Sequence, residues 1–281
     1  MVTNPLENSI GDTTEKHIIS TAQLAHYHQL GYVDSVGVLT AAEVDYFRHQ
    51  FDQTCALLGG NVIRMDGAHE LLHWVWQLST HPALLGSMEK LLGPDIILKS
   101  TRFFYKPANS ANFVSWHQDG YIERKNGLAV PTVWLGLTDS TPDNGCLQVI
   151  EASHHRGYVA HPKMPNKANM TYDGITAQID NGKVANIAMA AGFMSLHHPL
   201  TVHGSQPNVS SGPRIGFSAS YGTPELVTSS TDVAWVRGAK NAPEIAPESK
   251  GLVFIEPPKP CPLPEAVAQY QRLCPDRILR L

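Results

Sequence analysis

A histidine and an aspartate two residues apart, His117 and Asp119 in the segment SWHQDGY, are the sharpest chemical signal in the chain. Side chains at i and i+2 of an extended segment point to one face, so one strand end can present an imidazole and a carboxylate to one metal ion. A third ligand must come from elsewhere, and His203, which is followed by Arg214, is a candidate. Two histidines and one carboxylate leave the open coordination positions that iron(II) oxygenases need.

The pair alone is a weak signal, because histidine and aspartate often lie two apart and His117 could equally be a hydrogen-bonded surface residue. Three segments in order are more specific: WHQDGY, then VWLGLTDSTPDNGCLQVIEASHHRG, then HHPLTVHGSQPNVSSGPRIGFSASY. On these segments the chain, from about Gln23 to Arg237, resembles the phytanoyl-CoA dioxygenase family of Fe(II)/2-oxoglutarate-dependent oxygenases.

The resemblance implies a metal centre and a cosubstrate pocket. The iron(II) ligands that it implies are His117, Asp119 and His203. Its implied contacts to the cosubstrate 2-oxoglutarate are Arg214, Ser205 and Trp134. A planar guanidinium suits the distal carboxylate of 2-oxoglutarate because it can donate two parallel hydrogen bonds. Ser205 follows the distal histidine on the same strand face. Trp134 could instead be an ordinary core residue, and Arg214 could form a surface salt bridge.

The implied reaction consumes 2-oxoglutarate and O2, releases succinate and CO2, and hydroxylates an unactivated C–H bond of a small molecule. Amino acids, alkylphosphonates and natural-product intermediates are the substrate classes expected. Halogenating relatives lack the carboxylate ligand, so the presence of Asp119 favours hydroxylation, while desaturation and ring closure stay open. A binding protein on the same fold would not need three ligands together with Arg214.

Four further residues are candidates for substrate contact: Tyr105, Lys106, Tyr121 and Arg237. The first three could reach a substrate bound near the metal. Arg237 lies in a C-terminal WVRG segment that could cover an anionic substrate. His197 and His198 are adjacent, so at most one of them can face the site if the segment is extended.

A competing hypothesis comes from HELLH at residues 69–73. His69 and His73 are four apart with Glu70 between them, the spacing of zinc metalloproteases on a continuous helix. Trp76 and Ser79 stand where one such family needs glycine and histidine. We therefore expect this segment to be a helix that lines the pocket or packs on the sandwich.

Composition excludes several other classes. The 281 residues are 42% hydrophobic and 16% charged with a net charge of −4, and they contain no lysine- or arginine-rich run, so neither nucleic acid nor a membrane surface is an expected partner. The four cysteines show no CxxC spacing, and no signal-peptide or membrane-spanning stretch is visible. These features predict a cytoplasmic protein with a small-molecule substrate.

The elements that must position the site are predicted from periodicity and turn residues. We expect one oxygenase domain over residues 1–281, mainly β with flanking helices around a double-stranded β-helix, the jelly-roll or cupin-like sandwich. Its parts are a flexible tail over 1–17, a helical region over 18–95, a β-sandwich core over 96–225 and an extension over 226–281. Expected helices begin near Ser20, at Thr40 with Glu43 in capping-box spacing, and cover 68–79, 81–92 and the PEAVAQYQRL segment.

Overall fold

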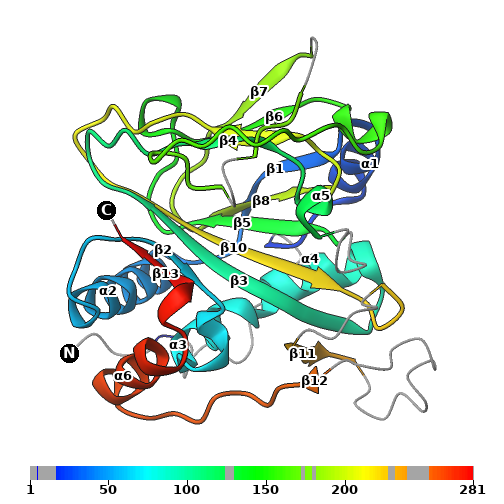
Figure 1. Ribbon diagram of the computed structural model, residues 1–281. Coiled ribbons are helices and arrows are strands. Elements are labelled where there is room, and N and C mark those ends of the chain that lie inside the picture. Colours follow the sequence, from blue (N-terminus) through cyan, green and yellow to red (C-terminus); the bar gives the residue numbers. More distant parts are fainter. Residues whose placement is uncertain are drawn as a thin grey trace.

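Two facing sheets, mostly antiparallel, form the centre of the molecule in the computed structural model, and helices cover one of them (Figure 1). The structure describes Pro5 and residues 17–123, 130–171, 175–178, 182–226, 232–238 and 253–280. This architecture confirms the predicted fold class, a mainly β protein with flanking helices around a jelly-roll core. In the described part of the chain, no helix is long and apolar enough to span a membrane.

The larger sheet gathers strands from the whole length of the chain. Its order is β1 (Tyr32–Gly37), β8 (Phe193–His197), β5 (Thr132–Gly136), β10 (Arg214–Gly222), β3 (Ile96–Lys106), β11 (Asp232–Arg237) and β12 (Val253–Phe254). Two more strands, β2 (Val62–Asp66) and β13 (Ile278–Arg280), extend it beside β3. The smaller sheet has the order β4 (Val114–His117), β9 (His203–Ser205), β6 (Leu147–Ile150) and β7 (Val184–Ile187).

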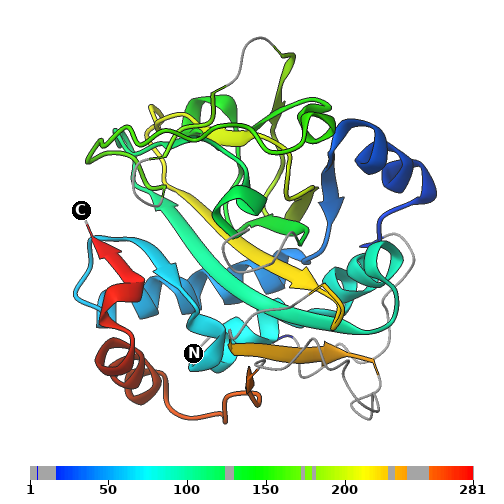
Figure 2. The same cartoon turned by 45° about the vertical axis from the view of Figure 1, so that its right-hand side comes forward.

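Helices lie on the face of the larger sheet that points away from the smaller one (Figures 1 and 2). The helices of this layer are α2 (Ala41–Leu57), α3 (His73–Ser79), α4 (Pro82–Leu92) and α6 (Leu263–Leu273). Helix α1 (Thr21–Leu30) lies beside β1, and the short α5 (Asp119–Glu123) follows β4. Short 3-10 turns are η3 (Ala68–Glu70), η5 (Pro142–Asn144), η6 (Ser153–Arg156) and η9 (Pro275–Arg277).

The N-terminal helices begin where the sequence predicts. Ser20 caps α1, and its hydroxyl accepts a hydrogen bond from the backbone N–H of Gln23. Thr40 caps α2 through a capping box with Glu43, whose carboxylate accepts from the Thr40 backbone N–H at 2.7 Å. Each box satisfies backbone donors that have no partner inside the helix. Gly31 ends α1 with a φ of 87°, a conformation that glycine adopts without steric cost.

Strand pairing decides which side chains face the helices and which face the smaller sheet. Phe217 of β10 lies opposite Phe103 of β3, and both are fully buried against the helical layer. One residue along, Ser218 lies opposite Arg102 on one side and Trp134 of β5 on the other. Because successive side chains alternate between faces, Arg102, Ser218 and Trp134 point between the two sheets.

The two faces of the larger sheet therefore differ in what they bury. The apolar core between the larger sheet and the helices includes Phe47, Phe51 and Tyr270, each at most 2% exposed. Burying each such side chain stabilises the fold by roughly 1.5–3 kcal/mol. The apolar cluster between the sheets is smaller and centres on Trp134 and Leu147. Polar side chains can therefore occupy the remaining space between the sheets.

Some boundaries differ from the prediction. The region 18–95 contains strands β1 and β2 as well as helices, and the region after 226 contains β11, β12 and β13. The helix expected over 68–79 is broken, because Leu72 is extended (φ −97°, ψ 108°) and separates η3 from α3. The tail predicted over 1–17 lies outside the described residues except for Pro5 and His17.

Candidate functional site

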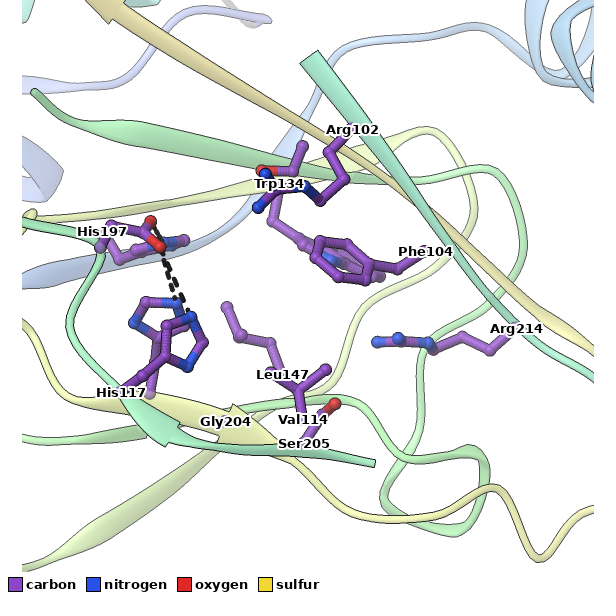
Figure 3. Close-up of a pocket in the computed structure, with 13 residues that line it drawn as sticks. Arg102, Phe104, Val114, His117, Trp134, Leu147, His197, Gly204, Ser205 and Arg214 are labelled. Carbon is purple, nitrogen blue, oxygen red and sulfur yellow. Dashed lines mark hydrogen bonds and ion pairs between the residues drawn. The ribbon is translucent and has the colours of Figure 1, made fainter. Parts of the chain in front are cut away.

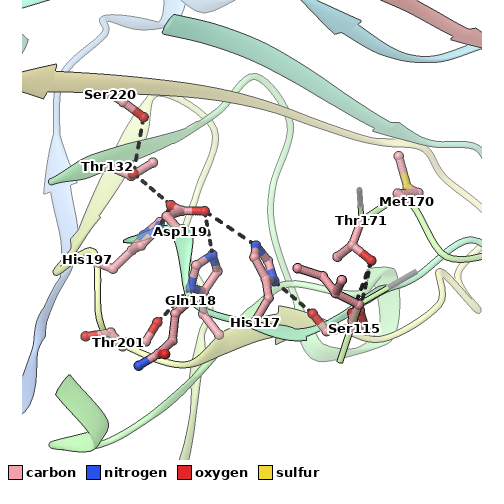
Figure 4. A network of polar contacts seen from close by, with 12 residues as sticks. Ser115, His117, Gln118, Asp119, Thr132, Met170, Thr171, His197, Thr201 and Ser220 are labelled. Carbon is pink, nitrogen blue, oxygen red and sulfur yellow. Dashed lines mark hydrogen bonds and ion pairs between the residues drawn. The ribbon is translucent and has the colours of Figure 1, made fainter. Parts of the chain in front are cut away.

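Two histidines and an aspartate converge where strand β4 ends and strand β9 begins (Figure 4). His117 is the last residue of β4, and strand pairing sets it opposite His203, the first residue of β9. Asp119 opens α5, and its Oδ1 lies 3.5 Å from Nε2 of His117 and 3.7 Å from Nε2 of His203. Among the described residues this trio is the group of histidines, cysteines and acids placed to hold a metal ion.

The local backbone differs from the expected single extended segment. Strand β4 ends at His117, and the chain turns at Gln118 before Asp119 begins α5. Gln118 is fully buried, its backbone N–H donates to Nε2 of His161, and its side-chain amide donates to two backbone carbonyls. This anchored turn, rather than strand alternation, brings the carboxylate to the two imidazoles.

Hydrogen bonds to the backbone fix the tautomers of both histidines. Nδ1 of His117 lies 2.8 Å from the carbonyl of Ser115, and Nδ1 of His203 lies 2.9 Å from the carbonyl of Thr201. A carbonyl oxygen only accepts, so each Nδ1 carries a proton, and in the neutral form of each ring the lone pair then lies on Nε2, the nitrogen that faces Asp119. Donation of the second ring N–H to a backbone carbonyl is the usual support of a metal-ligating histidine.

The second oxygen of Asp119 is held by two donors. Its Oδ2 accepts from the hydroxyl of Thr132 at 2.8 Å and from Nε2 of His197 at 3.1 Å. Ser220 lies 3.3 Å from the Thr132 hydroxyl and extends the network across the larger sheet (Figure 4). The carboxylate is therefore oriented with Oδ1 facing the two imidazoles.

Electrostatics favour an ionised Asp119 and a neutral His203. Burial raises the pKa of Asp119, but its interactions with the imidazoles of His203, His117 and His197 outweigh the effect of burial and hold the pKa well below 3.8. Burial lowers the pKa of His203 well below 6.5, and the nearby imidazoles of His117 and His197 act in the same direction. In these protonation states Asp119 and His203 can each donate an electron pair to a cation.

The same cavity contains the three residues expected to contact the cosubstrate (Figure 3). Ser205, Trp134 and Arg214 line it together with the metal trio. The guanidinium of Arg214 lies 5.0 Å from the centre of a Trp134 ring. A Cβ at Gly216 would lie 2.2 Å from that indole, so glycine leaves the space that the Trp134 ring occupies beside β10.

Arg214 is a buried cation without a carboxylate partner. Its side chain is 1% exposed, its Nε has no hydrogen-bond partner, and no described acidic residue forms an ion pair with it. Burial lowers the pKa of Arg214 to about 10. An unpaired buried charge is costly, so this guanidinium fits a site that receives an anion.

A buried lysine adjoins Arg214. Lys106 is fully buried opposite Arg214 in the strand register, and its Nζ donates to Oγ of Ser205 at 2.7 Å and to the backbone carbonyl of Gln206. Burial and the charge of Arg214 lower the pKa of Lys106 to about 5. Because the lysine donates to Ser205, the serine proton can point toward the cavity. Lys106 therefore lies behind the site and orients a cavity residue.

The other residues predicted to contact substrate lie elsewhere. Tyr105 packs on the helical side of the larger sheet, where its ring centre lies 5.9 Å from that of Phe51. Tyr121 stacks on His161 at 3.9 Å. Arg237 forms an ion pair with Glu89 of α4 at 2.7 Å. None of these three is among the described residues that line the cavity.

The HELLH segment does not form a metal site in the described structure. His69 lies in η3 and His73 opens α3, so the continuous helix that the motif requires is absent from this segment. Nδ1 of His69 contacts the hydroxyl of Thr101, and the carboxylate of Glu70 accepts from Arg277 at 2.6 Å. The metalloprotease hypothesis is therefore wrong.

Three residues of the site belong to no motif that the sequence makes visible. Thr132 and Arg102 sit on strands whose register the sequence does not reveal, and nothing in their neighbourhood marks them. For His197, the sequence indicates only that it and its neighbour His198 cannot both face the site. The structure turns His197 toward Asp119, while the ring of His198 packs near Tyr27.

Comparison with solved structures supports the fold. The non-haem monooxygenase ThoJ, in its apo form, has a TM-score of 0.72 and 25% identity, with 91% of this chain and 95% of the other covered. EctD from S. alaskensis, solved with 2-oxoglutarate and 5-hydroxyectoine, has a TM-score of 0.64 over 90% of this chain and 92% of its own. At 18% identity EctD supports the fold alone.

Sequence comparison gives the family. Peroxisomal phytanoyl-CoA dioxygenase of Bos taurus is 25% identical over 237 residues, which are 74% of this chain and 70% of the bovine protein. L-proline trans-4-hydroxylase of Streptomyces griseoviridis is 27% identical over 183 residues, which are 58% of this chain and 68% of the relative. The phytanoyl-CoA dioxygenase (PhyH) family model matches residues 27–216. With most of its length inside that match, this chain belongs to the phytanoyl-CoA dioxygenase family.

Proposed function

We propose that this chain is an iron(II)- and 2-oxoglutarate-dependent hydroxylase of a small molecule, releasing succinate and CO2. One observation carries the proposal. Lone pairs of two imidazoles and one carboxylate oxygen converge in a cavity that also contains a buried arginine without a carboxylate partner. A metal site alone would not need the arginine, and an anion site alone would not need the trio.

His117, Asp119 and His203 are the proposed ligands of iron(II). Their donor set, two neutral imidazole nitrogens and one carboxylate, leaves coordination positions for a bidentate 2-oxo acid and O2. Backbone carbonyls hold both imidazoles, and Thr132 and His197 hold the carboxylate, so the donors are oriented before metal arrives. A preorganised trio loses little conformational freedom on binding.

Arg214, Ser205 and Trp134 are the proposed contacts of 2-oxoglutarate. The guanidinium can pair with the distal carboxylate, and the Ser205 hydroxyl, oriented by Lys106, can donate to it. Trp134 gives the carbon chain an apolar wall and limits the movement of the arginine. Iron bound at the trio would supply the O2 activation, while these residues orient the cosubstrate toward it.

The cavity walls also serve to exclude competing reactions. Phe104, Val114 and Leu147 supply apolar surface between the metal trio and Arg214. Apolar walls limit water near the proposed cosubstrate, which strengthens the charge pairing with Arg214. The protein's own contribution is therefore orientation, charge neutralisation and exclusion of water.

Small molecules are the proposed substrate class. The curated relatives include a proline hydroxylase and, in Stutzerimonas stutzeri, a probable hypophosphite dioxygenase that is 25% identical over 206 residues. We therefore propose an amino acid, an alkylphosphonate or a natural-product intermediate as the substrate. Halogenating relatives lack the carboxylate ligand, and this chain would offer Asp119 to the iron, which favours hydroxylation over halogenation. Desaturation or cyclisation is the second candidate outcome.

A cytoplasmic location is part of the proposal. The described cysteines Cys55, Cys146, Cys261 and Cys274 are all free thiols, which is compatible with a reducing compartment. Fractionation of the native host with a blot against the chain would test the location independently of activity.

Metal-dependent turnover tests the proposed function. Metal-free protein given Fe(II), 2-oxoglutarate and O2 should form succinate, and candidate substrates should gain one oxygen by mass spectrometry. Zn(II) should not replace Fe(II), because zinc has no redox chemistry. Full activity with zinc alone, or no succinate with iron under any substrate, would contradict the proposal.

A further inference from the structure

The buried lysine behind the proposed cosubstrate site is hydrogen-bonded to neutral groups. Lys106 of β3 is 0% exposed, and its Nζ donates to Oγ of Ser205 at 2.7 Å and to the backbone carbonyl of Gln206. Neither acceptor carries a charge, and no acidic residue in the described part of the chain contributes to its electrostatics. A neutral amine has two N–H groups, so these two acceptors satisfy it without a third proton.

The backbone packs closely around this amine. A Cβ at Gly145 would lie 3.0 Å from Nζ of Lys106 and 2.2 Å from the carbonyl oxygen of Gln206. The chain at Gly145 therefore closes directly over the lysine. Removal of an ammonium group from water penalises its charged form, and a lysine in such surroundings gives up its proton more readily.

The charged and titratable neighbours of Lys106 do not offset this penalty. Arg214 lies opposite it in the pairing of β10 with β3, and its positive charge also opposes protonation. Cys146, just before β6, is a titratable neighbour, but burial raises the pKa of its thiol, which stays neutral at pH 7. Strand β9 and its end contribute the neutral Ser205 and Gln206. The amine is therefore neutral before an anion binds, in agreement with its pKa of about 5.

A carboxylate bound at Arg214 and Ser205 would reverse this balance. Both residues line the cavity, with His117 on its other side (Figure 3). A hydroxyl-to-carboxylate hydrogen bond is about 2.7 Å long, and Nζ of Lys106 lies 2.7 Å from the same hydroxyl oxygen. The carboxylate would therefore lie within about 5.5 Å of the amine. An opposite charge within about 4–6 Å stabilises the protonated form of a lysine.

We propose that Lys106 takes up a proton from solvent when the distal carboxylate of 2-oxoglutarate binds at Arg214 and Ser205. The inference rests on the proposed function, because it assumes that the cavity binds 2-oxoglutarate. The proton converts the amine to an ammonium group, which keeps its hydrogen bond to Ser205 and adds a second positive charge beside the anion. Lys106 is thus a positioning residue that acts through Ser205 and makes cosubstrate affinity depend on pH.

The sign of this pH dependence is fixed. Binding raises the pKa of Lys106, so the affinity that the ammonium contributes is fully present below about pH 5, the pKa before binding. It is lost as pH rises through the higher pKa of the complex. Between these two values the Kd for 2-oxoglutarate should increase by up to about tenfold per pH unit, because one proton is bound with the ligand.

The experiment measures proton uptake on binding. Co(II)-loaded protein, in which the metal keeps its ligands deprotonated, is titrated with 2-oxoglutarate from about pH 6 to about pH 8 while the Co(II) absorbance is recorded. The Kd of wild type should increase with pH, and calorimetry in two buffers of different ionisation enthalpy should show net proton uptake. Lys106→Met, which lacks the amine, should show neither effect. Lys183→Met should behave like wild type, because that side chain is 78% exposed and pairs with Glu151.

2-Oxopentanoate is the matched ligand. It has the five-carbon chain and the 2-oxo acid group of 2-oxoglutarate but lacks the distal carboxylate. It should bind more weakly than 2-oxoglutarate, because it leaves Arg214 unpaired. Its Kd for wild type should not change over the same pH range, because no negative charge reaches Lys106.

Three results would overturn the inference: binding of 2-oxoglutarate by wild type without proton uptake, equal uptake by Lys106→Met, and equal uptake with 2-oxopentanoate. No binding of 2-oxoglutarate by the Co(II)-loaded wild type would instead contradict the proposed function. If Lys106→Met does not fold, NMR of Zn(II)-loaded wild type with 13C-labelled lysine decides. A Cε resonance typical of a neutral amine should move to the ammonium position when 2-oxoglutarate is added, and no such movement would overturn the inference.

Discussion

Nε2 of His197 donates a hydrogen bond to Oδ2 of Asp119 at 3.1 Å. An ionised carboxylate can only accept, so Nε2 of this imidazole carries a proton. Its other ring nitrogen, Nδ1, is buried without a hydrogen-bond partner. His197 is 2% exposed and lies on β8, opposite Thr132, the other donor to Oδ2. The pair links the larger sheet to the proposed iron ligand on the opposite side of the cavity.

The first prediction follows from that hydrogen bond. His197→Leu should weaken iron binding about 10- to 100-fold, because partners that orient a metal ligand contribute affinity of that order. His197→Gln, which keeps an N–H donor, should recover part of it. His198→Leu is the matched control, since that ring packs near Tyr27 instead. Anaerobic titration with Fe(II) or Co(II) measures the affinities, and equal values for His197→Leu and wild type would show that Asp119 needs no such support.

The second prediction concerns the buried arginine. Arg214→Ala should weaken 2-oxoglutarate binding about 30-fold to several thousand-fold, because loss of one partner of a desolvated charge pair costs roughly 2–5 kcal/mol. Arg214→Lys should recover only part, since it keeps the charge but lacks the planar fork. Iron content should not change in either variant. Wild-type affinity for 2-oxoglutarate in Arg214→Ala would remove this residue from the cosubstrate site.

The third prediction tests the packing of Trp134. In Gly216→Ala the new Cβ would lie 2.2 Å from the indole, so the ring must move away from its position beneath Arg214. We expect a loss of roughly 1–3 kcal/mol in unfolding free energy, the usual cost of overpacking, together with weaker 2-oxoglutarate binding. Gly212→Ala is the control, because no atom lies within 4 Å of its Cβ position. Chemical denaturation measures the unfolding free energy, and calorimetry measures the affinity for 2-oxoglutarate. If Gly216→Ala matches Gly212→Ala in both, the packing argument is contradicted.

The fourth prediction concerns HELLH. Glu70 pairs with Arg277 at 2.6 Å, and these side chains are 21% and 38% exposed. Exposed ion pairs contribute at most about 1 kcal/mol, so Glu70→Gln should lower stability only slightly and leave succinate formation within a few-fold of wild type. Glu89→Gln, which breaks the similar pair with Arg237, is the control. Complete loss of turnover in Glu70→Gln with iron content unchanged would place chemistry at this segment after all.

Local chemistry made part of this structure predictable. Thr40 and Glu43 have capping-box spacing, and the box forms because its hydrogen bonds span only three residues. Ser205 lies two residues after His203 on one short strand, so both line the cavity. Features that depend on neighbours in sequence could thus be predicted from it.

Features that depend on long-range pairing could not. Arg102 and Ser218 are neighbours only because β3 and β10 pair in one register. A shift of one residue would turn Arg102 toward the helices. The break in the helix at Leu72 has a similar origin. The Leu72 side chain is fully buried in the apolar core between the larger sheet and the helices, and this packing overrides the local preference for helix. Short strands such as β2 and β13 gain their stability from the sheet that they join.

The most direct test of the central claim is whether one cavity binds iron and 2-oxoglutarate together. Fe(II)-loaded wild type is titrated with 2-oxoglutarate without oxygen while the visible spectrum is recorded. Chelation of iron by a 2-oxo acid produces a charge-transfer band, which should grow and saturate for wild type and need a much higher 2-oxoglutarate concentration for Arg214→Ala. If the wild type binds iron and 2-oxoglutarate and no band appears, the two do not meet at His117, Asp119 and His203, and the account is contradicted.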